Sequence, residues 1–338
     1  MSALSEFEYR YNMTIKAFPS HAEPAFESDQ QQQELWGGTT WGCDNDVGRL
    51  RKVLMHRPGD ELSIVDPEKH LEDLGSYGDR EGQTWYWRGN YIPSLAELQE
   101  QHDALTGTLR DEGVEVVLLK RCAPGRHKAI YTRDSCIGVK GGAIVTRLGP
   151  IVRRGEEAPV TETLAAIGMP ILRTVHGTGI MEGGSFVWLK PNLAVVGRSA
   201  RVNEEGTRQV EEVLNAQGAE LIRVDLTGYR LHIDGMLVMI DVDTAIVNPT
   251  QIPFWFLEKL QELKIRTIEV HPDDPVGILN CIAVRPGRVV MQAGAAPRTA
   301  EAMDKLGIEI VPVPYEKVFQ GGGGIHCSTS PLQRDSIA

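Results

Sequence analysis

The sequence predicts an α/β protein built from repeated units, and two observations support this prediction. Five amphipathic segments each end in a short turn and continue directly into an apolar, β-branched stretch, which is the pattern of a helix followed by a strand. These turns recur at intervals of 43 to 55 residues, at Gly113, Gly168, Gly218, Lys264 and Gly307. One helix with two or three strands, repeated five times, is typical of an architecture in which no single unit buries its own apolar face.

The expected elements alternate along the chain. The helices are expected at 95–112, 160–167, 203–217, 254–263 and 299–306, and each is followed by a strand. Glycine stands at four of the five turns, as expected where the chain leaves a helix through a positive φ angle. Further strands are expected at 51–56, 143–147, 186–196, 236–248 and 281–293. This order gives a unit of the form ββαβ.

Two segments do not follow the repeat. Residues 1–45, which include the Gln30–Gln33 run, are expected to form an N-terminal extension or arm, and residues 46–338 a single catalytic domain. Residues 59–92 form an insertion between the first strand and the first helix, and it contains Trp85 and Trp87. Insertions of this length are often functional. The aromatic pair indicates either a lid over the site or an interface.

Composition and charge restrict the function classes. The 338 residues carry a formal net charge of −11, which argues against nucleic acid or an anionic membrane as a partner. The N-terminus has no signal-peptide pattern, and no stretch is apolar for long enough to span a membrane. The five cysteines are odd in number and have no Cys-x-x-Cys spacing, so neither a disulfide framework nor a zinc site is expected. We expect a cytoplasmic protein with reduced thiols, without a metal or cofactor.

Four polar stretches stand out because each falls in a different repeat. They are Tyr131-Thr-Arg-Asp134, Glu182-Gly-Gly-Ser185, His232-Ile-Asp234 and His326-Cys327. Taken singly, each also has an ordinary structural interpretation, such as a surface ion pair, a turn or a half-exposed strand. Zinc binding is disfavoured because no second histidine or cysteine stands at ligand spacing.

Taken together, these residues suit covalent attack on a cationic planar carbon. Carboxylates can hold the N–H groups of a guanidinium and neutralise its charge. A thiolate is a strong nucleophile that is populated near neutral pH, particularly beside positive charge. A histidine can protonate the leaving amine and then activate water. Four consecutive glycines, Gly321–Gly324, precede His326 and Cys327. They would let the backbone approach a ligand closely.

The ordered set of motifs after residue 45 resembles the guanidino-group-modifying enzymes of the pentein fold. This group comprises arginine deiminases, agmatine deiminases, dimethylarginine hydrolases and amidinotransferases. The segments 48–62 and 92–117 resemble the first strand, first helix and following strand of arginine deiminases. The four polar stretches then follow in family order. The resemblance implies a five-bladed, pseudo-symmetric α/β propeller without metal or cofactor.

The resemblance also implies roles for individual residues. Cys327 would be the nucleophile and His232 the acid and base. Asp134 and Asp234 would clamp the substrate, and Glu182 would hold His232 and contact the substrate. The substrate-binding set further includes Arg133, Arg201, Lys128, Ser185 and Gly322.

Three of these positions depart from the arginine deiminase pattern. Gly322 replaces an arginine that helps to bind the substrate carboxylate, and Lys128 replaces an asparagine. Ser185 gives the Glu-Gly-Gly-Ser form found in agmatine deiminases. Free L-arginine is therefore expected to be a poor substrate compared with tail-less or neutral guanidines.

The resulting expectation is a cysteine-dependent, deiminase-like hydrolase that cleaves a C–N bond of a guanidine or an amidine-like small molecule. Three alternatives remain open at this stage. The protein could be an amidinotransferase that passes the amidino group to an amine, or a hydrolase that displaces nitrite from a nitroimidazole-like ring. It could also be a binding protein on the same scaffold. A homo-oligomer is compatible with each of these.

Overall fold

The computed structural model describes residues 4–17, 34, 40–82, 84–122, 125–275 and 279–337, in two compact units, Met1–Thr40 and Trp41–Ala338. In the first unit, α1 (Glu6–Tyr11) begins with a capping box and continues into the π-helical turn η1 (Asn12–Ala17). The Gln30–Gln33 run lies outside the described residues. The boundary between the units falls at Thr40, before the expected residue 45, because Trp41 is buried and Gly42 donates its N–H to the carbonyl of Leu332.

Among its described residues the second unit contains six three-stranded sheets, and five of them are each accompanied by a helix in the same ββαβ order. Four of them are continuous in sequence: β6 (Cys136–Val139), β7 (Gly142–Val145), α4 (Glu157–Ala166) and β8 (Ile171–Thr174); β9 (Phe186–Lys190), β10 (Leu193–Arg198), α5 (Glu204–Ala216) and β11 (Glu220–Asp225); β12 (Leu237–Asp241), β13 (Thr244–Val247), α6 (Phe254–Glu262) and β14 (Arg266–Glu269); β15 (Ile282–Arg285), β16 (Arg288–Gln292), α7 (Pro297–Lys305) and β17 (Glu309–Val313).

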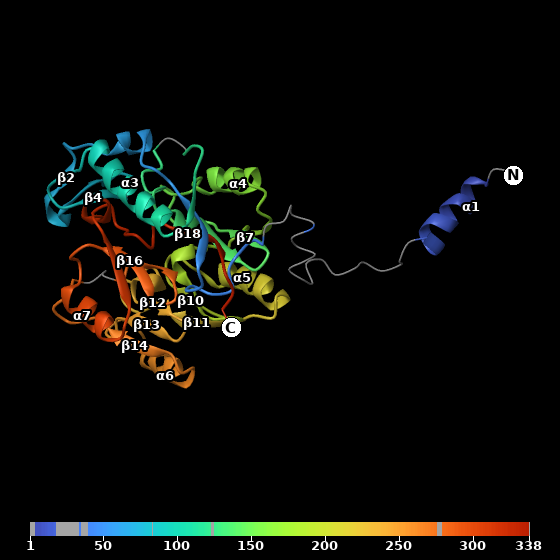
Figure 1. Cartoon of the computed structure of the whole chain (residues 1–338). Coiled ribbons are helices and arrows are strands. Elements are labelled where there is room, and N and C mark those ends of the chain that lie inside the picture. Colours follow the sequence, from blue (N-terminus) through green and yellow to red (C-terminus); the bar gives the residue numbers. More distant parts are fainter. Residues whose placement is uncertain are drawn as a thin grey trace. The chain divides into compact units, whose positions relative to one another are not determined.

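The fifth sheet is assembled from both ends of the unit. Strand β18 (Ser330–Arg334) pairs antiparallel with β1 (Leu50–Met55), which pairs in parallel with β5 (Glu115–Leu118) after helix α3 (Leu95–Asp111). In Figure 1 the red C-terminal strand lies beside the blue one. Each of the four sheets that are continuous in sequence also has one antiparallel and one parallel pair. The expected ββαβ repeat is confirmed, and its arrangement as a five-bladed propeller stays a prediction.

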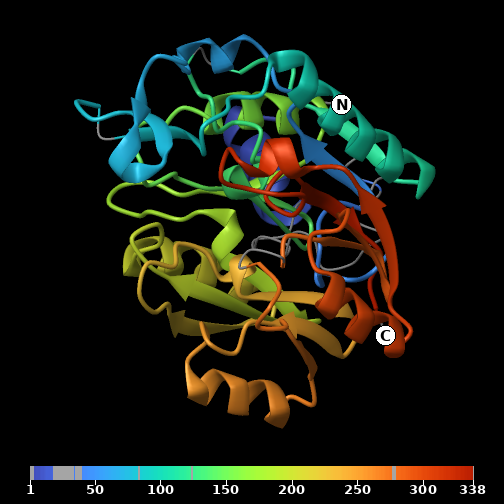
Figure 2. The same ribbon diagram turned by 90° about the vertical axis from the view of Figure 1, so that its left-hand side faces the viewer.

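Capping residues mark the first turns of several helices, and each helix of the second unit is stabilised by burial of one of its faces. Ser94 and Glu97 form a reciprocal capping box at α3, and the Asn203 side chain accepts from Gly206 N–H at α5. Pro297 occupies the first turn of α7. The turned view shows α6, in orange, outside the sheet that it crosses (Figure 2). Each helix therefore serves as the crossover between two parallel strands of its own sheet.

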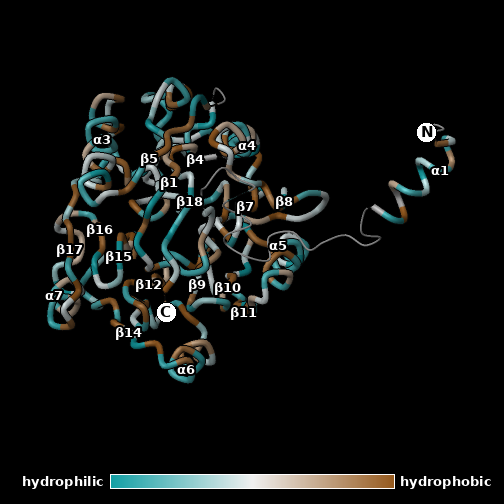
Figure 3. Tube along the Cα trace, turned by 45° about the vertical axis from the view of Figure 1, so that its right-hand side comes forward, coloured by the Kyte–Doolittle hydropathy of each residue, from teal (hydrophilic) through white to brown (hydrophobic). Residues whose placement is uncertain are grey.

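The core lies among the strands, many of which carry hydrophobic stretches (Figure 3). Strands β6 and β7 are buried along their whole length, and Leu50, Val53 and Met55 of β1 are fully buried. Strands covered on both faces are expected to be apolar throughout rather than alternating. None of the described helices combines the length and the apolar character needed to cross a membrane.

The insertion at 59–92 is ordered around a small sheet of its own. It comprises η2 (Asp60–Ile64), β2 (His70–Leu71), η3 (Glu72–Leu74), β3 (Ser76–Asp79) and β4 (Thr84–Arg88), and its strand order is β2-β3-β4. Trp87 is 2% exposed and packs into the core with Leu50 and Tyr131, so it is a core residue rather than part of a lid surface. The side chain of Trp85 lies outside the described residues.

Candidate active site

The predicted polar residues meet at one cavity of about 390 Å³. Cys327, His232, Asp134 and Asp234 all line it, although they are spread over nearly 200 residues of sequence. Lys128, Arg201 and Gly322 line it as well. Glu182 is completely buried and contacts the cavity residue His232. The structure therefore brings together eight of the ten residues that the sequence singled out.

The repeat explains why these residues converge, because each stands just before the first strand of a sheet. Asp134 lies in η4 (Thr132–Ser135) before β6, Glu182 precedes η5 (Gly183–Ser185) and β9, and Asp234 lies in η6 (Ile233–Gly235) before β12. Cys327 precedes β18, and Asn280 precedes β15. All five sheets thus contribute a polar residue from equivalent positions.

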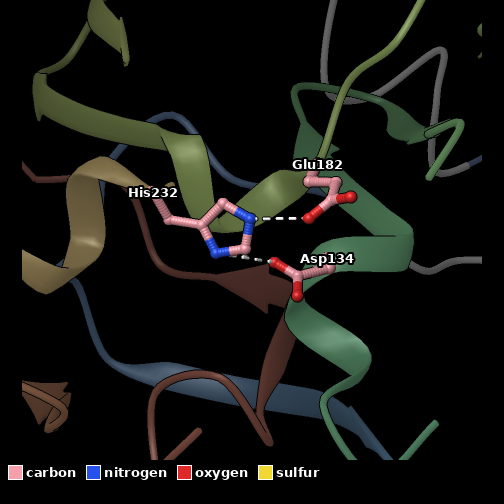
Figure 4. A group of neighbouring side chains, drawn as sticks. All are labelled: Asp134, Glu182 and His232. Carbon is pink, nitrogen blue, oxygen red and sulfur yellow. Dashed lines mark hydrogen bonds and ion pairs between the residues drawn. The ribbon is translucent and has the colours of Figure 1, made fainter. Parts of the chain in front are cut away.

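The His232 ring lies between two carboxylates, one at each ring nitrogen (Figure 4). Its Nε2 is 2.6 Å from Oε2 of Glu182, and its Nδ1 is 3.6 Å from Oδ1 of Asp134. Burial alone would lower the pKa of His232, but the charge of Asp134 and the hydrogen bond and charge of Glu182 raise it to about 9. His232 is therefore protonated at neutral pH and prepared to donate a proton.

Glu182 remains ionised although it is buried. Burial would raise its pKa, but the hydrogen bond and charge of His232 outweigh that effect and lower the pKa to about 2. Its Oε1 accepts the N–H of Gly149 at 2.9 Å, and Nη1 of Arg201 lies 3.2 Å from Oε2. These contacts hold the carboxylate, and through it the orientation of the imidazole.

Asp134 is fixed by the chain itself. Its Oδ2 accepts from Nη1 of Arg153 at 2.5 Å, and its Oδ1 accepts from the N–H of Gly184 at 3.0 Å. Arg153 is buried and is also paired with Glu156, and the charges of Glu156 and Asp134 raise its pKa even though burial opposes this. One oxygen of the expected clamp is thus already bound to an internal guanidinium.

Gly184 permits this close arrangement. A Cβ atom at this position would lie 2.7 Å from Oδ1 of Asp134 and 2.9 Å from Nδ1 of His232. Neither neighbour is the free end of a flexible surface chain, since both are held by the contacts described above. The second glycine of the Glu-Gly-Gly motif is therefore required by the packing of the site itself.

Cys327 is held by Asn280 through two contacts. Nδ2 of Asn280 donates to Sγ at 3.1 Å, and Oδ1 of Asn280 accepts the N–H of Cys327 at 3.1 Å. Burial and the charges of Asp234 and Asp134 raise the pKa of the thiol. This corrects the sequence-based expectation of a thiolate stabilised by positive charge, because two carboxylates rather than cations dominate its surroundings. The resting residue is a thiol.

Asp234 is the second carboxylate of the cavity floor, and it contacts the histidine beside the nucleophile. Its Oδ2 is 2.8 Å from Nδ1 of His326. Burial and the charge of Arg133 lower the pKa of His326, although Asp234 opposes them. His326 is therefore a neutral residue that orients Asp234, and it does not line the cavity.

The glycine run packs so closely against the cavity wall that there is no room for side chains at Gly323 and Gly324. A Cβ at Gly323 would lie 2.6 Å from Cδ1 of Tyr131, and one at Gly324 would lie 2.7 Å from Cγ of Asn280. Nζ of Lys128 donates to the carbonyls of Tyr86 and Gly321, at 2.7 and 2.5 Å. Lys128 thus ties the insertion to the glycine run, and burial holds its pKa well below the ordinary value.

Two predicted substrate-binding residues lie outside the cavity lining. The Arg133 side chain is directed to Asp46, at 3.6 Å, and its N–H donates to the carbonyl of Cys327. The hydroxyl of Ser185 donates to the carbonyl of Leu231 at 3.3 Å. Neither residue lines the cavity, and their expected role in substrate binding stays a prediction.

Among the charged and amide side chains of the cavity, sequence reasoning missed four: Asn280, Arg153, Arg88 and Arg230. The equivalent position before β15 could have pointed to Asn280, because the other four units each carry a predicted residue there. The arginines follow no motif, and only the fold places them at the cavity.

One group of side chains has the composition of a metal site. Single ligand atoms of Asp134, Glu182 and His232 lie within 4.8 Å of one another. Two of these atoms, Nε2 of His232 and Oε2 of Glu182, already bind each other at 2.6 Å. A metal ion would have to displace this hydrogen bond and the proton on His232. The donor set is better explained as a histidine held between carboxylates.

Known proteins with similar sequences include a dimethylarginine dimethylaminohydrolase and arginine deiminases. The N(G),N(G)-dimethylarginine dimethylaminohydrolase of Pseudomonas aeruginosa is 27% identical over 239 residues, which is 70% of this chain and 88% of that protein. An arginine deiminase of Rhodococcus erythropolis is 23% identical over an alignment of 421 residues, which covers 89% of this chain and 99% of that protein.

Solved structures show the same fold. The dimethylarginine dimethylaminohydrolase of Pseudomonas aeruginosa in complex with citrulline matches with a TM-score of 0.66 and 24% identity, over 83% of this chain and 99% of that one. SxtG, an amidinotransferase from Microseira wollei, matches with a TM-score of 0.69 and 14% identity, over 88% of this chain and 98% of that one. The chain thus has the pentein fold that its motifs predicted.

The fold, the cavity and the relatives define a guanidino-modifying hydrolase that acts on carbon–nitrogen bonds other than peptide bonds. The family model described as N,N dimethylarginine dimethylhydrolase, eukaryotic, matches residues 90–334. The protein belongs to this dimethylarginine dimethylhydrolase family.

Proposed function

We propose that the protein hydrolyses a C–N bond at the guanidino carbon of a small molecule through a covalent intermediate on Cys327. The observation that supports this most directly is the single cavity that unites Cys327, a protonated His232 and the carboxylates of Asp134 and Asp234. Thiol, acid and carboxylates are the groups that such a substitution requires.

Substrate binding prepares the nucleophile. The guanidinium lies between Asp134 and Asp234, whose negative charges raise the thiol pKa in the free enzyme. A bound cation compensates these charges, so the pKa of Cys327 falls and its proton passes to solvent. The Asn280 amide N–H, at 3.1 Å from Sγ, stabilises the resulting thiolate. Asp134 accepts the substrate with Oδ1, the oxygen that Arg153 does not bind and that also accepts the N–H of Gly184.

The chemical steps then require only His232. Sγ attacks the guanidino carbon, the C–N bond to the leaving amine breaks, and His232 donates its proton to that amine. A water molecule attacks the resulting S-amidino carbon while neutral His232 takes its proton. The C–S bond breaks, the new hydroxyl group loses its proton to solvent, a urea-type product leaves, and the thiolate and imidazolium are regenerated. Glu182 keeps the imidazole oriented throughout, at 2.6 Å.

Turnover of a guanidine panel tests this proposal. Wild type should release an amine and a urea-type product from at least one guanidine, with and without a chelator. Cys327→Ser should be inactive, whereas Cys122→Ser, at a half-buried cysteine away from the cavity, should retain activity. Product formation that depends on an added amine acceptor would instead indicate amidino transfer. Undiminished turnover by Cys327→Ser would contradict the mechanism.

A further inference from the structure

The charge of the cavity changes from its floor to its outer part. At the floor, the lining carboxylates Asp134 and Asp234 are only 2% and 3% exposed. Four arginines line the same cavity: Arg153 is bound to Asp134 at the floor, and the other three are Arg88, Arg201 and Arg230. Tyr229, which contacts Arg230, is 79% exposed, and Arg88 is exposed as well, so these residues lie where the cavity opens to solvent. A ligand that enters therefore meets positive charge first and negative charge last.

Two of these arginines are not neutralised by the protein. Arg201 pairs with Glu182, but neither Arg88 nor Arg230 forms an ion pair with any carboxylate in the part of the chain that the structure describes. An arginine offers five N–H donors, so a single protein contact leaves most of them for a ligand. Two guanidinium groups without counter-charge at a cavity mouth attract anions.

Both arginines are nonetheless held in defined positions. Nη2 of Arg88 donates to the carbonyl of Phe319 at 3.0 Å, and its guanidinium lies 4.9 Å from the centre of the Phe319 ring. Nη2 of Arg230 lies 3.3 Å from the Tyr229 hydroxyl, and its guanidinium lies 4.7 Å from that ring. Stacking on an aromatic face restrains a guanidinium without using its charge.

The outer part of the cavity also disfavours a cation at the end of the substrate. The carboxylates among the described lining residues are Asp134 and Asp234, and both lie at the floor. An ammonium group on the tail, as in agmatine or at the α-carbon of arginine, would meet arginines with no carboxylate to bind it. Lys128, which the sequence placed among the tail-binding residues, directs its Nζ to two backbone carbonyls.

We propose that the substrate is an ω-guanidino oxyanion without a tail ammonium, and that Arg88 and Arg230 bind its carboxylate or phosphate-type group. This inference rests on the proposed function, because the floor residues place the guanidino end. It replaces the expectation of a neutral or tail-less substrate. Arg88 comes from the inserted sheet, so the insertion would contribute to specificity rather than to the chemistry.

A series of guanidines that differ in their tail group tests the inference. We would compare kcat/KM for 4-guanidinobutanoate, 3-guanidinopropylphosphonate, butylguanidine, agmatine and L-arginine. A charge-assisted hydrogen bond in a closed site corresponds to roughly a tenfold to hundredfold effect. The oxyanions should exceed butylguanidine by this factor, and agmatine should be poorest. The advantage should shrink at high salt, because screening weakens exposed charge pairs.

Variants identify the residues that recognise the tail. Arg230→Ala and Arg88→Ala should lower kcat/KM for the oxyanion substrates about tenfold more than for butylguanidine. Arg266→Ala, at an exposed arginine away from the cavity, should leave the ranking as in wild type. If butylguanidine or agmatine equals the oxyanions in wild type, or if the two variants lower all substrates equally, the inference is wrong.

Binding separates this inference from the proposed function. If no guanidine is turned over, the proposed hydrolysis is wrong. Calorimetric titration of Cys327→Ser with the same five compounds then measures whether the tail group affects binding. The inference is supported if at least one of the two oxyanions binds more tightly than butylguanidine. Equal affinities across the series overturn it even if turnover is observed. Comparison of the carboxylate with the phosphonate shows which oxyanion the arginines prefer.

Discussion

Substitution of Glu182 by glutamine should shift the titration of His232. Glutamine keeps the shape of the side chain but removes the negative charge 2.6 Å from Nε2. A pKa of about 9, compared with the ordinary 6.5, stabilises the imidazolium by about 3 kcal/mol in the folded protein. Asp134 contributes the other main part of this effect. Removal of one such charge lowers a histidine pKa by about 1–2 units.

Two measurements follow from this substitution. The imidazole resonance of His232 in Glu182→Gln should titrate about 1–2 pH units lower than in wild type. The alkaline limb of the pH profile of kcat/KM should move to lower pH by the same amount, because this limb reports loss of the proton that His232 donates. An unchanged titration in a folded variant would refute the account of the Glu182–His232 pair.

The same pKa shifts determine how stability depends on pH. The folded pKa of His232 is raised, so its stabilising contribution is complete below pH 6.5 and is lost as the pH rises through about 9. The folded pKa of Glu182 is lowered, so its contribution is present above pH 4.5 and is lost as the pH falls through about 2. The free energies of unfolding of wild type and His232→Gln, measured with denaturant, should therefore differ most between pH 4.5 and pH 6.5. The difference should be smaller above pH 9.

Three further predictions concern neighbouring residues. Asn280→Ala should lower kcat/KM about tenfold to a hundredfold, since Cys327 loses a donor to Sγ and an acceptor for its N–H; a kcat/KM equal to that of wild type would remove Asn280 from the site. Gly184→Ala should lower both activity and Tm because its Cβ would press on Asp134, whereas Gly107→Ala, in α3 with nothing within 4 Å, should stabilise by about 0.5–1 kcal/mol. Alkylation of Cys327 by a neutral haloacetamide at pH 7 should be much slower than that of a free thiol, because its pKa is raised; rapid labelling would show a resting thiolate.

Much of the fold could be read from the sequence because helix and strand patterns agree with the repeat. The helix expected at 254–263 is α6 (Phe254–Glu262), and the expected strand 186–196 is the hairpin of β9 and β10. Strands β6 and β18 were not expected. Each follows a short polar turn that belongs to the site, and β18 finds its partner β1 at the other end of the unit.

The candidate site could be predicted in its residues but not in its electrostatics. The motif order pointed to Cys327, His232 and the three carboxylates without any view of their distances. Arg153 on Asp134 and Asn280 on Cys327 are tertiary contacts between segments that no local pattern connects. For the same reason no local pattern shows that burial beside two carboxylates raises the pKa of the Cys327 thiol.

Mass spectrometry of the quenched enzyme tests the central proposal most directly. A guanidine that is turned over should leave wild-type protein with a transient mass increase that corresponds to one S-amidino group. Peptide mapping should locate this group on Cys327, and Cys327→Ser should acquire no such mass. Turnover of the same guanidine without any adduct on Cys327, or with the adduct on another residue, would contradict the account.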